Sequence, residues 1–237
     1  MSHPNVRRAA IIVGAGRGTR FGANDKVLAP LNGRPVIAYS LDAAEQAELV
    51  DVIVVVASEH LFDAMSSLIS TGVWSKVVAV IVGGERRQDS VANGLAVLPE
   101  DIKLVAIHDA ARPLVTASLF DETLRVASAS GAAIVAIPVA DTLKRVSDHQ
   151  IIETVSREHL WAAQTPQSFH LPTLRHAFAL AETDNLAVTD EASLYEATNL
   201  PVSIVVGSPA NLKITHATDL AIACALLAYR TSHEGVS

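Results

Sequence analysis

A glycine-rich segment that carries basic side chains follows the first apolar run of the sequence. Residues 14–20 read Gly-Ala-Gly-Arg-Gly-Thr-Arg, and a lysine, Lys26, comes shortly after them. Because glycines let backbone N–H groups approach an anion closely, segments of this kind bind phosphates. The spacing matches neither a Walker A loop nor the Gly-x-Gly-x-x-Gly dinucleotide fingerprint. Arg17, Arg20 and Lys26 nevertheless favour phosphate binding over the alternative of a simple tight turn.

A second polar segment, residues 83–90, follows another apolar run and reads Gly-Gly-Glu-Arg-Arg-Gln-Asp-Ser. Its two glycines could let the backbone form a platform for a nucleobase or a ribose. It could equally be a surface loop in which Asp89 or Ser90 caps the helix that follows. The residues alone leave both interpretations open.

A third segment, residues 108–113, reads His-Asp-Ala-Ala-Arg-Pro and follows a further apolar run. A carboxylate such as Asp109, facing a phosphate-binding loop, suits Mg²⁺, because hard oxygen ligands and phosphates share that ion. Arg112 could bind a second anion, and an Asp–Arg salt bridge within a turn is the alternative. His108 is expected to be a packed histidine, because no second histidine lies at metal-binding spacing.

The composition bounds the class of protein that can carry this chemistry. The chain has 237 residues, 50% of them hydrophobic, and 18 Lys+Arg against 25 Asp+Glu give a net charge of −7. The apolar content excludes a disordered chain, and the acidic balance argues against a protein that coats nucleic acid. The length fits one large α/β domain or two small ones.

The single cysteine and the lack of a long apolar stretch indicate in which cellular compartment the protein resides. Cys224 lies in an apolar run, so we expect a buried core thiol and no intramolecular disulfide. The first residues do not resemble a signal peptide, and no apolar stretch reaches the roughly 18–20 residues of a membrane span. We therefore expect a cytoplasmic protein without a membrane partner.

Short apolar runs of strand length alternate with helical patterns over the first part of the chain. The predicted strands are Ala9–Val13, Val52–Ala57, Val77–Val82, Leu104–Ile107 and Ala132–Ile137. The predicted helices are Val36–Ala47, Leu61–Ser70, Ser90–Leu98 and Ser118–Ser128. Continuous apolar strands are buried on both faces, as in parallel sheets covered by helices. The alternation predicts a Rossmann-like, mostly parallel α/β sheet with helices on both faces, in a single domain over residues 1–237.

The pattern changes after Pro138. Residues 141–156 alternate around the polar turn 147–150, which predicts a β-hairpin arm leaving the sheet. The later predicted elements are helices at 171–182 and 190–197, a strand at 202–206, a helix at 218–229 begun by Thr218 as N-cap, and a frayed tail at 231–237.

Ligands of open α/β sheets bind beyond the carboxyl ends of the strands. The segments that follow the predicted strands are 14–26, 83–89, 108–113 and 139–144, and all four are polar, glycine-rich or charged. We therefore expect them to form one binding site for phosphates.

Taken in order, these segments resemble the 2-C-methyl-D-erythritol 4-phosphate cytidylyltransferase family of the isoprenoid methylerythritol phosphate pathway. The most specific signatures are His-Asp-Ala-Ala-Arg-Pro at 108–113 and Thr-Asp-Glu-Ala-Ser at 189–193. The glycine segment is shared by many nucleotidyltransferases and is less specific. The further matching segments are 141–144, 164–167 and 211–215.

The resemblance implies a reaction of CTP with a sugar-alcohol phosphate that releases pyrophosphate and depends on Mg²⁺. It also implies a homodimer in which the arm, residues 141–163, reaches the neighbouring subunit. The implied catalytic residues are Arg20, Lys26 and Lys213. The implied nucleotide-binding residues are Ala15, Gly16, Gly18, Gly84, Glu85 and Ser90. The implied substrate-binding residues are Arg112, Thr142, Lys144, Arg157, Thr165 and Thr189, and the implied metal ligand is Asp109.

Two departures from the family pattern and two rival functions stay open. Asp25 replaces the usual proline before Lys26, and Ala210 replaces an aspartate that many members carry as a second metal carboxylate. One rival is the same reaction on another alcohol phosphate, such as ribitol 5-phosphate. The other is a Rossmann-type oxidoreductase, for which Glu59 could hold a ribose although the glycine spacing is wrong.

Overall fold

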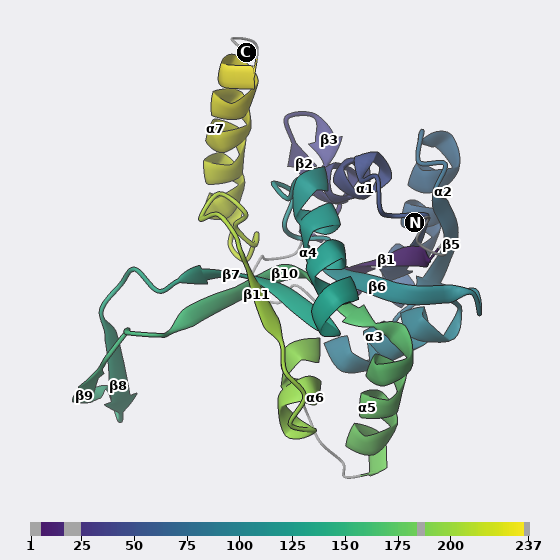
Figure 1. Ribbon diagram of the computed structural model, residues 1–237. Helices are drawn as coiled ribbons and strands as arrows, with labels where there is room; N and C mark the ends of the chain where they lie inside the picture. The colour runs from purple at the N-terminus through teal and green to yellow at the C-terminus, as the bar shows by residue number, and fades with distance from the viewer. Residues whose placement is uncertain (1–5, 17–24, 184–187, 235–237) are drawn as a thin grey trace.

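The computed structural model describes residues 6–16, 25–183 and 188–234, and within them it contains a central sheet (Figure 1). The strands of this sheet are β1 (Arg7–Gly14), β4 (Val52–Ala57), β5 (Val77–Val82), β6 (Ile102–Asp109), β7 (Ala132–Pro138), β10 (Trp161–His170) and β11 (Ser203–Val206). Their spatial order is β11-β7-β10-β6-β1-β4-β5. β10 runs antiparallel to both of its neighbours, whereas the other paired strands of this sheet are parallel. The predicted mostly parallel sheet is therefore confirmed.

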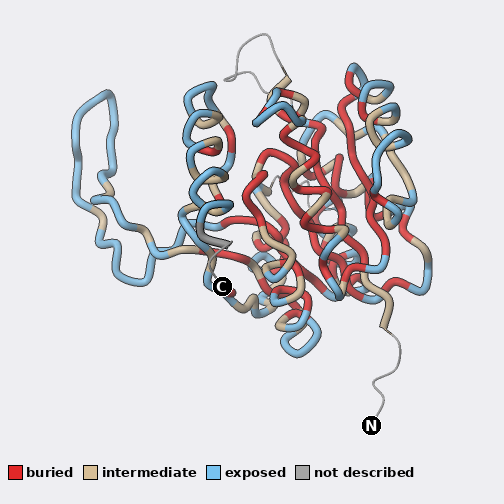
Figure 2. Tube along the Cα trace, turned by 90° about the horizontal axis from the view of Figure 1, so that it is seen from above, coloured by how far each residue is buried: buried red, intermediate tan, exposed pale blue. Residues whose placement is uncertain are grey.

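Helices cover both faces of the sheet. They are α1 (Val36–Gln46), η1 (Glu59–Leu61), α2 (Phe62–Thr71), α3 (Arg87–Ala96), α4 (Ala117–Ser130), α5 (Leu171–Thr183), α6 (Glu191–Ala197) and α7 (Ala217–Glu234). Successive side chains of a strand point to opposite faces. Ile12 of β1 accordingly packs with Leu41 of α1 and Phe120 of α4, whereas Ile11 packs with Val91 of α3 and with residues of α5 and α6. Figure 2 shows the buried residues concentrated between these layers.

Two strands differ from the sequence-based expectation. β5 was expected to be buried on both faces, but it lies at the edge of the sheet and its residues are only partly buried or exposed. β10 was not predicted at all, because Gln164, Thr165, Pro166 and Gln167 interrupt any apolar pattern. The polar members of this run are nevertheless buried, and hydrogen bonds to neighbouring segments satisfy them.

The predicted arm is present as a hairpin of β8 (Leu143–Ser147) and β9 (Gln150–Val155). It projects from the ends of β7 and β10, away from the sheet (Figure 1). The arm was expected over residues 141–163, but it ends earlier, because residues 161–163 pair with β7 in the main sheet. A small ladder of β2 (Pro30–Leu31) and β3 (Arg34–Pro35) precedes α1.

The C-terminal helix α7 is longer than predicted. It begins at Ala217 rather than after a Thr218 cap, and the carboxylate of Asp219 accepts hydrogen bonds from the backbone N–H groups of Thr215 and His216. The helix continues through Glu234, where a frayed tail was expected.

The expected burial of the single cysteine is only partly correct, because Cys224 is partly buried at the edge of a small apolar cluster. None of the described helices combines the length and the apolar character needed to cross a membrane.

Candidate active site

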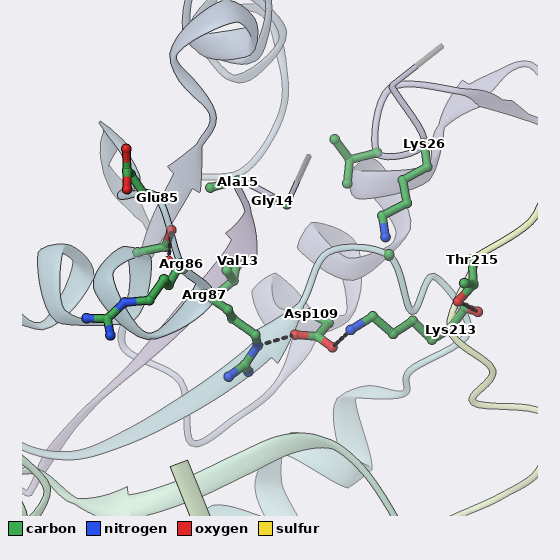
Figure 3. Close-up of a pocket in the computed structure, with 14 residues that line it drawn as sticks. Val13, Gly14, Ala15, Lys26, Glu85, Arg86, Arg87, Asp109, Lys213 and Thr215 are labelled. Carbon is green, nitrogen blue, oxygen red and sulfur yellow. Dashed lines mark hydrogen bonds and ion pairs between the residues drawn. The ribbon is translucent and has the colours of Figure 1, made fainter. Parts of the chain in front are cut away.

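A cavity of about 370 Å³ lies at the carboxyl ends of β1, β5 and β6 (Figure 3). Gly14 at the end of β1 contributes to it, as do Ala15 and Gly16 directly after that strand, Glu85 between β5 and α3, and Ser90 in the first turn of α3. Asp109 ends β6, and Lys26 and Lys213 complete the opposite wall. Three of the four segments expected at this edge therefore meet, whereas segment 139–144 leads into the arm and does not line the cavity.

Close backbone approach explains the two glycines beside the cavity. A Cβ at Gly83 would lie 2.5 Å from the Cβ of Ala15 and 2.6 Å from the Oγ of Ser90. A Cβ at Gly84 would lie 2.3 Å from the Cβ of Asp89, so a side chain fits at neither position. The Gly84 N–H donates to Ser90 Oγ at 3.1 Å, which holds the loop against α3. Gly84 itself does not line the cavity.

The structure bears out the helix-capping interpretation of segment 83–90 and leaves the platform interpretation a prediction. Asp89 accepts from the backbone N–H of Arg86 at 3.1 Å and from its guanidinium, so it caps α3 as the loop interpretation predicted. Glu85 and Ser90 of this segment line the cavity, together with Ala15 and Gly16. Their assignment to the nucleotide stays a prediction.

Two cations hold the carboxylate of Asp109. Lys213 Nζ lies 2.6 Å from Oδ2, and Arg87 Nε lies 3.0 Å from Oδ1. Burial alone would raise the pKa of Asp109, but Arg87 and Lys213 hold it well below its usual range. The carboxylate is therefore ionised near neutral pH, as a metal ligand or a partner of Lys213 must be.

Sequence reasoning missed Arg87 and Glu191 as site residues. Arg87 Nη1 donates to both carboxylate oxygens of Glu191, at 2.7 and 2.9 Å. Burial would lower the pKa of Arg87, but Glu191 and Asp109 together raise it above the ordinary value. Burial raises the pKa of Glu191, and Arg87 opposes that shift. Both residues lie inside motifs that the sequence singled out, yet only spatial proximity shows that they interact.

A buried network surrounds His108, behind the cavity. Thr165 Oγ1 accepts from the Asp109 N–H at 3.0 Å and lies 3.0 Å from His108 Nδ1, to which its own hydrogen is then directed. His108 Nε2 lies 3.3 Å from the carbonyl oxygen of Arg112. Burial is the main cause that lowers the pKa of His108 to about 3, so the ring is neutral. The expectation of a packed histidine is confirmed.

Arg112 and Thr165 were assigned to the substrate phosphate, and that assignment stays a prediction. In this chain the Arg112 Nη1 donates to the carbonyl oxygen of Asn211 at 2.8 Å. The hydroxyl of Thr165 is engaged by His108 and Asp109, and the residue is 4% exposed. Both side chains support the segments that carry Asp109 and Lys213.

The other predicted substrate residues lie away from the cavity of the same chain. Thr142, Lys144 and Arg157 belong to the arm, where Lys144 Nζ donates to Thr154 Oγ1 at 2.7 Å and Arg157 donates to the carbonyl oxygen of Ala140. Thr189 precedes α6 and does not line the cavity. Arg17, Gly18 and Arg20 fall outside the described residues, so their predicted roles rest on the sequence.

Two departures noted in the sequence have local consequences. Asp25, which stands before Lys26, pairs with His60, whose Nε2 lies 3.0 Å from each carboxylate oxygen. Lys26 points into the cavity (Figure 3). At the position of Ala210 there is no carboxylate, and no group of three or more potential metal-ligating side chains occurs in the described part of the chain.

A twisted, mostly parallel sheet, with a glycine segment and a cationic cavity at its carboxyl edge, defines an α/β protein of the nucleotidyltransferase type. A family model described as 2-C-methyl-D-erythritol 4-phosphate cytidylyltransferase matches residues 8–229. The chain belongs to this family. The dinucleotide-binding oxidoreductase alternative is thereby excluded, and Glu59, its ribose candidate, lies in η1 outside the lining of the cavity.

Relatives and solved structures agree with this assignment. The 2-C-methyl-D-erythritol 4-phosphate cytidylyltransferase of Parasynechococcus marenigrum is 46% identical over 222 residues, which cover 93% of this chain and 97% of the relative. The fold matches the 4-diphosphocytidyl-2C-methyl-D-erythritol synthase of Anaerococcus prevotii with a TM-score of 0.82, 26% identity and coverage of 94% and 96%. The Thermus thermophilus cytidylyltransferase matches with a TM-score of 0.76, 31% identity and coverage of 92% and 97%.

Proposed function

We propose that this protein transfers a CMP group from CTP to 2-C-methyl-D-erythritol 4-phosphate and releases pyrophosphate, as a step of non-mevalonate isoprenoid synthesis. The observation that carries the proposal is the cavity in which Lys26, Arg87 and Lys213 gather at the carboxyl edge of the sheet, beside the backbone of Ala15 and Gly16. The family of the chain supplies the choice of substrates.

The proposed reaction needs charge and position rather than covalent help from the protein. A phosphate oxygen of the alcohol phosphate attacks the α-phosphorus of CTP, a new P–O bond forms, and the bond to the β-phosphate oxygen breaks. Because the attacking group is already an oxyanion, the step needs no general base. Catalysis of this kind depends on in-line positioning and on cations at the oxygens that gain negative charge.

The lysines of the cavity suit that task. Lys26 and Lys213 enter it from one wall (Figure 3), where they could contact the α-phosphate and the leaving pyrophosphate. The resemblance to the family assigns Arg20 to the same oxygens. Glu85 and Ser90, on the other side, would contact the cytosine and ribose. A preorganised donor of this type contributes about 3–4 kcal/mol to the transition state.

We include Mg²⁺ in the proposal because the donor set fits an ion shared with the nucleotide. Mg²⁺ is commonly held by one or two carboxylates together with substrate phosphates and water. Asp109 would supply the protein ligand, at the centre of the cavity wall. The ion, when bound, would neutralise charge on the triphosphate. The two oxygens of this carboxylate also contact Arg87 and Lys213, so the ion would share Asp109 with these two cations.

The proposal also includes a cytoplasmic homodimer with exchanged arms. The hairpin exposes large apolar side chains: Val146 is 54% exposed, Ile151 65% and Ile152 62%. Exposed apolar surface of this kind marks an interaction site. A second copy of the chain that covers the arm would bring Thr142, Lys144 and Arg157 to the partner's cavity, which explains why they do not line the cavity of their own chain.

The direct test measures pyrophosphate release from CTP with methylerythritol 4-phosphate or ribitol 5-phosphate as acceptor, with Mg²⁺ and with excess chelator. We expect release with the first acceptor, little with the second, and none after chelation. Equal or preferential use of ribitol 5-phosphate would replace the proposed substrate. No release with any acceptor would refute the proposed reaction, and undiminished release in chelator would remove the metal from it.

A further inference from the structure

The guanidinium of Arg87 lies between two carboxylates that come from distant parts of the chain. Its Nε contacts Asp109 at the end of β6 at 3.0 Å, and its Nη1 contacts Glu191 in the first turn of α6 at 2.7 Å. The side chain of Glu191 is 1% exposed and that of Asp109 is 10% exposed, so water competes little for either contact. Figure 3 shows Arg87 reaching from α3 toward Asp109 at the wall of the cavity.

A buried glutamate needs a reason, because removing an ionised carboxylate from water costs several kcal/mol unless a cation compensates it. Arg87 is the cation that compensates Glu191. Glu191 does not line the cavity, so it is not placed to touch a nucleotide. Its effect on the site must therefore pass through Arg87, whose planar fork fixes the direction of each nitrogen once one carboxylate is bound.

The position of Glu191 is itself fixed from the sheet. Gln167 of β10, 1% exposed, donates to Asp190 at 2.9 Å and accepts from the Ala192 N–H at 3.4 Å. Asp190 in turn accepts from the Ser193 N–H at 3.2 Å as the N-cap of α6. These contacts tie the start of α6 to β10, which pairs with β6, the strand that ends at Asp109. Glu191 is thus a rigid anchor and not a mobile surface charge.

We propose that Glu191 and Arg87 are positioning residues of the active site: Glu191 orients Arg87, Arg87 fixes Asp109, and Asp109 holds Lys213 toward the phosphates. This inference rests on the proposed function, which supplies the reaction whose charged groups these residues position. It adds a relay of ionic contacts, from α6 to the cavity, that the sequence motifs did not contain.

The relay predicts a particular kinetic signature. Glu191→Gln keeps the shape of the side chain but removes its charge, so Arg87 is balanced by Asp109 alone and turns toward it. Misplacement of a catalytic group by about 1 Å can cost roughly 100-fold in rate, so we expect kcat to fall by about 10- to 100-fold. The KM for the alcohol phosphate should change by less than about 2-fold, since neither residue is assigned to that substrate.

The test is a double-mutant cycle with Glu191→Gln, Arg87→Ala and the double variant. The matched control is Glu196→Gln, at the exposed end of the same helix. If Glu191 acts through Arg87, Glu191→Gln lowers kcat in the native background and has no further effect once Arg87 is alanine. Should Glu191→Gln fail to fold, Glu191→Asp, which keeps the charge and withdraws it by one methylene, replaces it in the cycle.

Binding of CTP without the acceptor, measured by calorimetry in Mg²⁺, gives a readout that needs no turnover. We expect Glu191→Gln to weaken CTP binding relative to Glu196→Gln. Equal CTP binding and equal kcat in these two variants would overturn the inference, as would equal losses of kcat from Glu191→Gln in both Arg87 backgrounds. A native protein that binds CTP but transfers CMP to no acceptor would instead refute the proposed function, and the binding comparison would still decide the inference.

Discussion

The ammonium of Lys213 lies 2.6 Å from Oδ2 of Asp109, which joins the segment after β11 to the end of β6. The two residues are 104 positions apart in the sequence. Lys213 is 39% exposed, so an isolated pair there would contribute little to stability. Its value lies in geometry: the contact holds a cation at the wall of the cavity, on the same side as Lys26 (Figure 3).

The first prediction concerns this lysine. Lys213→Ala should lower the rate of pyrophosphate release by roughly 10²- to 10³-fold, because one preorganised cation at the transition state is lost. Steady-state kinetics with CTP and methylerythritol 4-phosphate measure the effect. Lys103→Ala, an exposed lysine at the start of β6, is the control and should keep native turnover. Near-native turnover in Lys213→Ala would contradict the assigned role.

The fold was largely predictable because apolar strands and amphipathic helices carry a local signal. β4 and β5 have the predicted bounds, and β1, β6 and β7 differ at their ends only. β10 was not predicted because the buried residues in its middle are polar. These residues form hydrogen bonds with partners elsewhere in the chain. Gln167, for example, bonds Asp190, which lies 23 positions away.

The residues alone predicted the site where a motif stood beside a strand, and the family resemblance added Lys213. Asp109 and the glycines follow directly from that rule. Arg87 and Glu191 did not, since each has an ordinary local explanation as a loop or cap residue. Their partnership spans 104 positions, and only the packing of α6 against the sheet brings them together.

The second prediction tests the structural role of Thr165. Thr165→Val removes the partner of the buried Asp109 N–H and of His108 Nδ1 while it keeps the volume. An unsatisfied buried polar group costs about 1–3 kcal/mol, so the free energy of unfolding in urea should fall by that amount. Thr165→Ser retains the hydroxyl and should lose less. Unchanged stability in the valine variant would show that these hydrogen bonds contribute nothing.

The third prediction tests the exchanged arm. Arg157→Ala and Lys213→Ala subunits are each expected to be inactive alone. If the arm completes the partner's cavity, a heterodimer has one site with both changes and one with neither. Random mixing should then restore roughly a quarter of the native activity. Native mass spectrometry verifies that heterodimers form. Heterodimers without activity would place Arg157 and Lys213 in the same site of one chain.

The last prediction follows from the neutral, buried ring of His108. Burial lowers its pKa in the folded protein to about 3, whereas an unfolded histidine titrates near 6.5. Between these values the unfolded chain binds a proton that the folded chain does not, so the free energy of unfolding falls as the pH falls. The loss reaches at most about 1.4 kcal/mol per pH unit from this one group.

Urea unfolding of the native protein and of His108→Gln between about pH 7.5 and 5.5 measures that contribution, in a window above most of the titration of unfolded aspartates and glutamates. The free energy of unfolding of the glutamine variant should depend less steeply on pH, by an amount that corresponds to up to one bound proton. Identical slopes for the native protein and His108→Gln would mean that the ring gains a proton in the folded state. It would then donate from both nitrogens, and Thr165 Oγ1 would have to accept from His108 as well as from the Asp109 N–H.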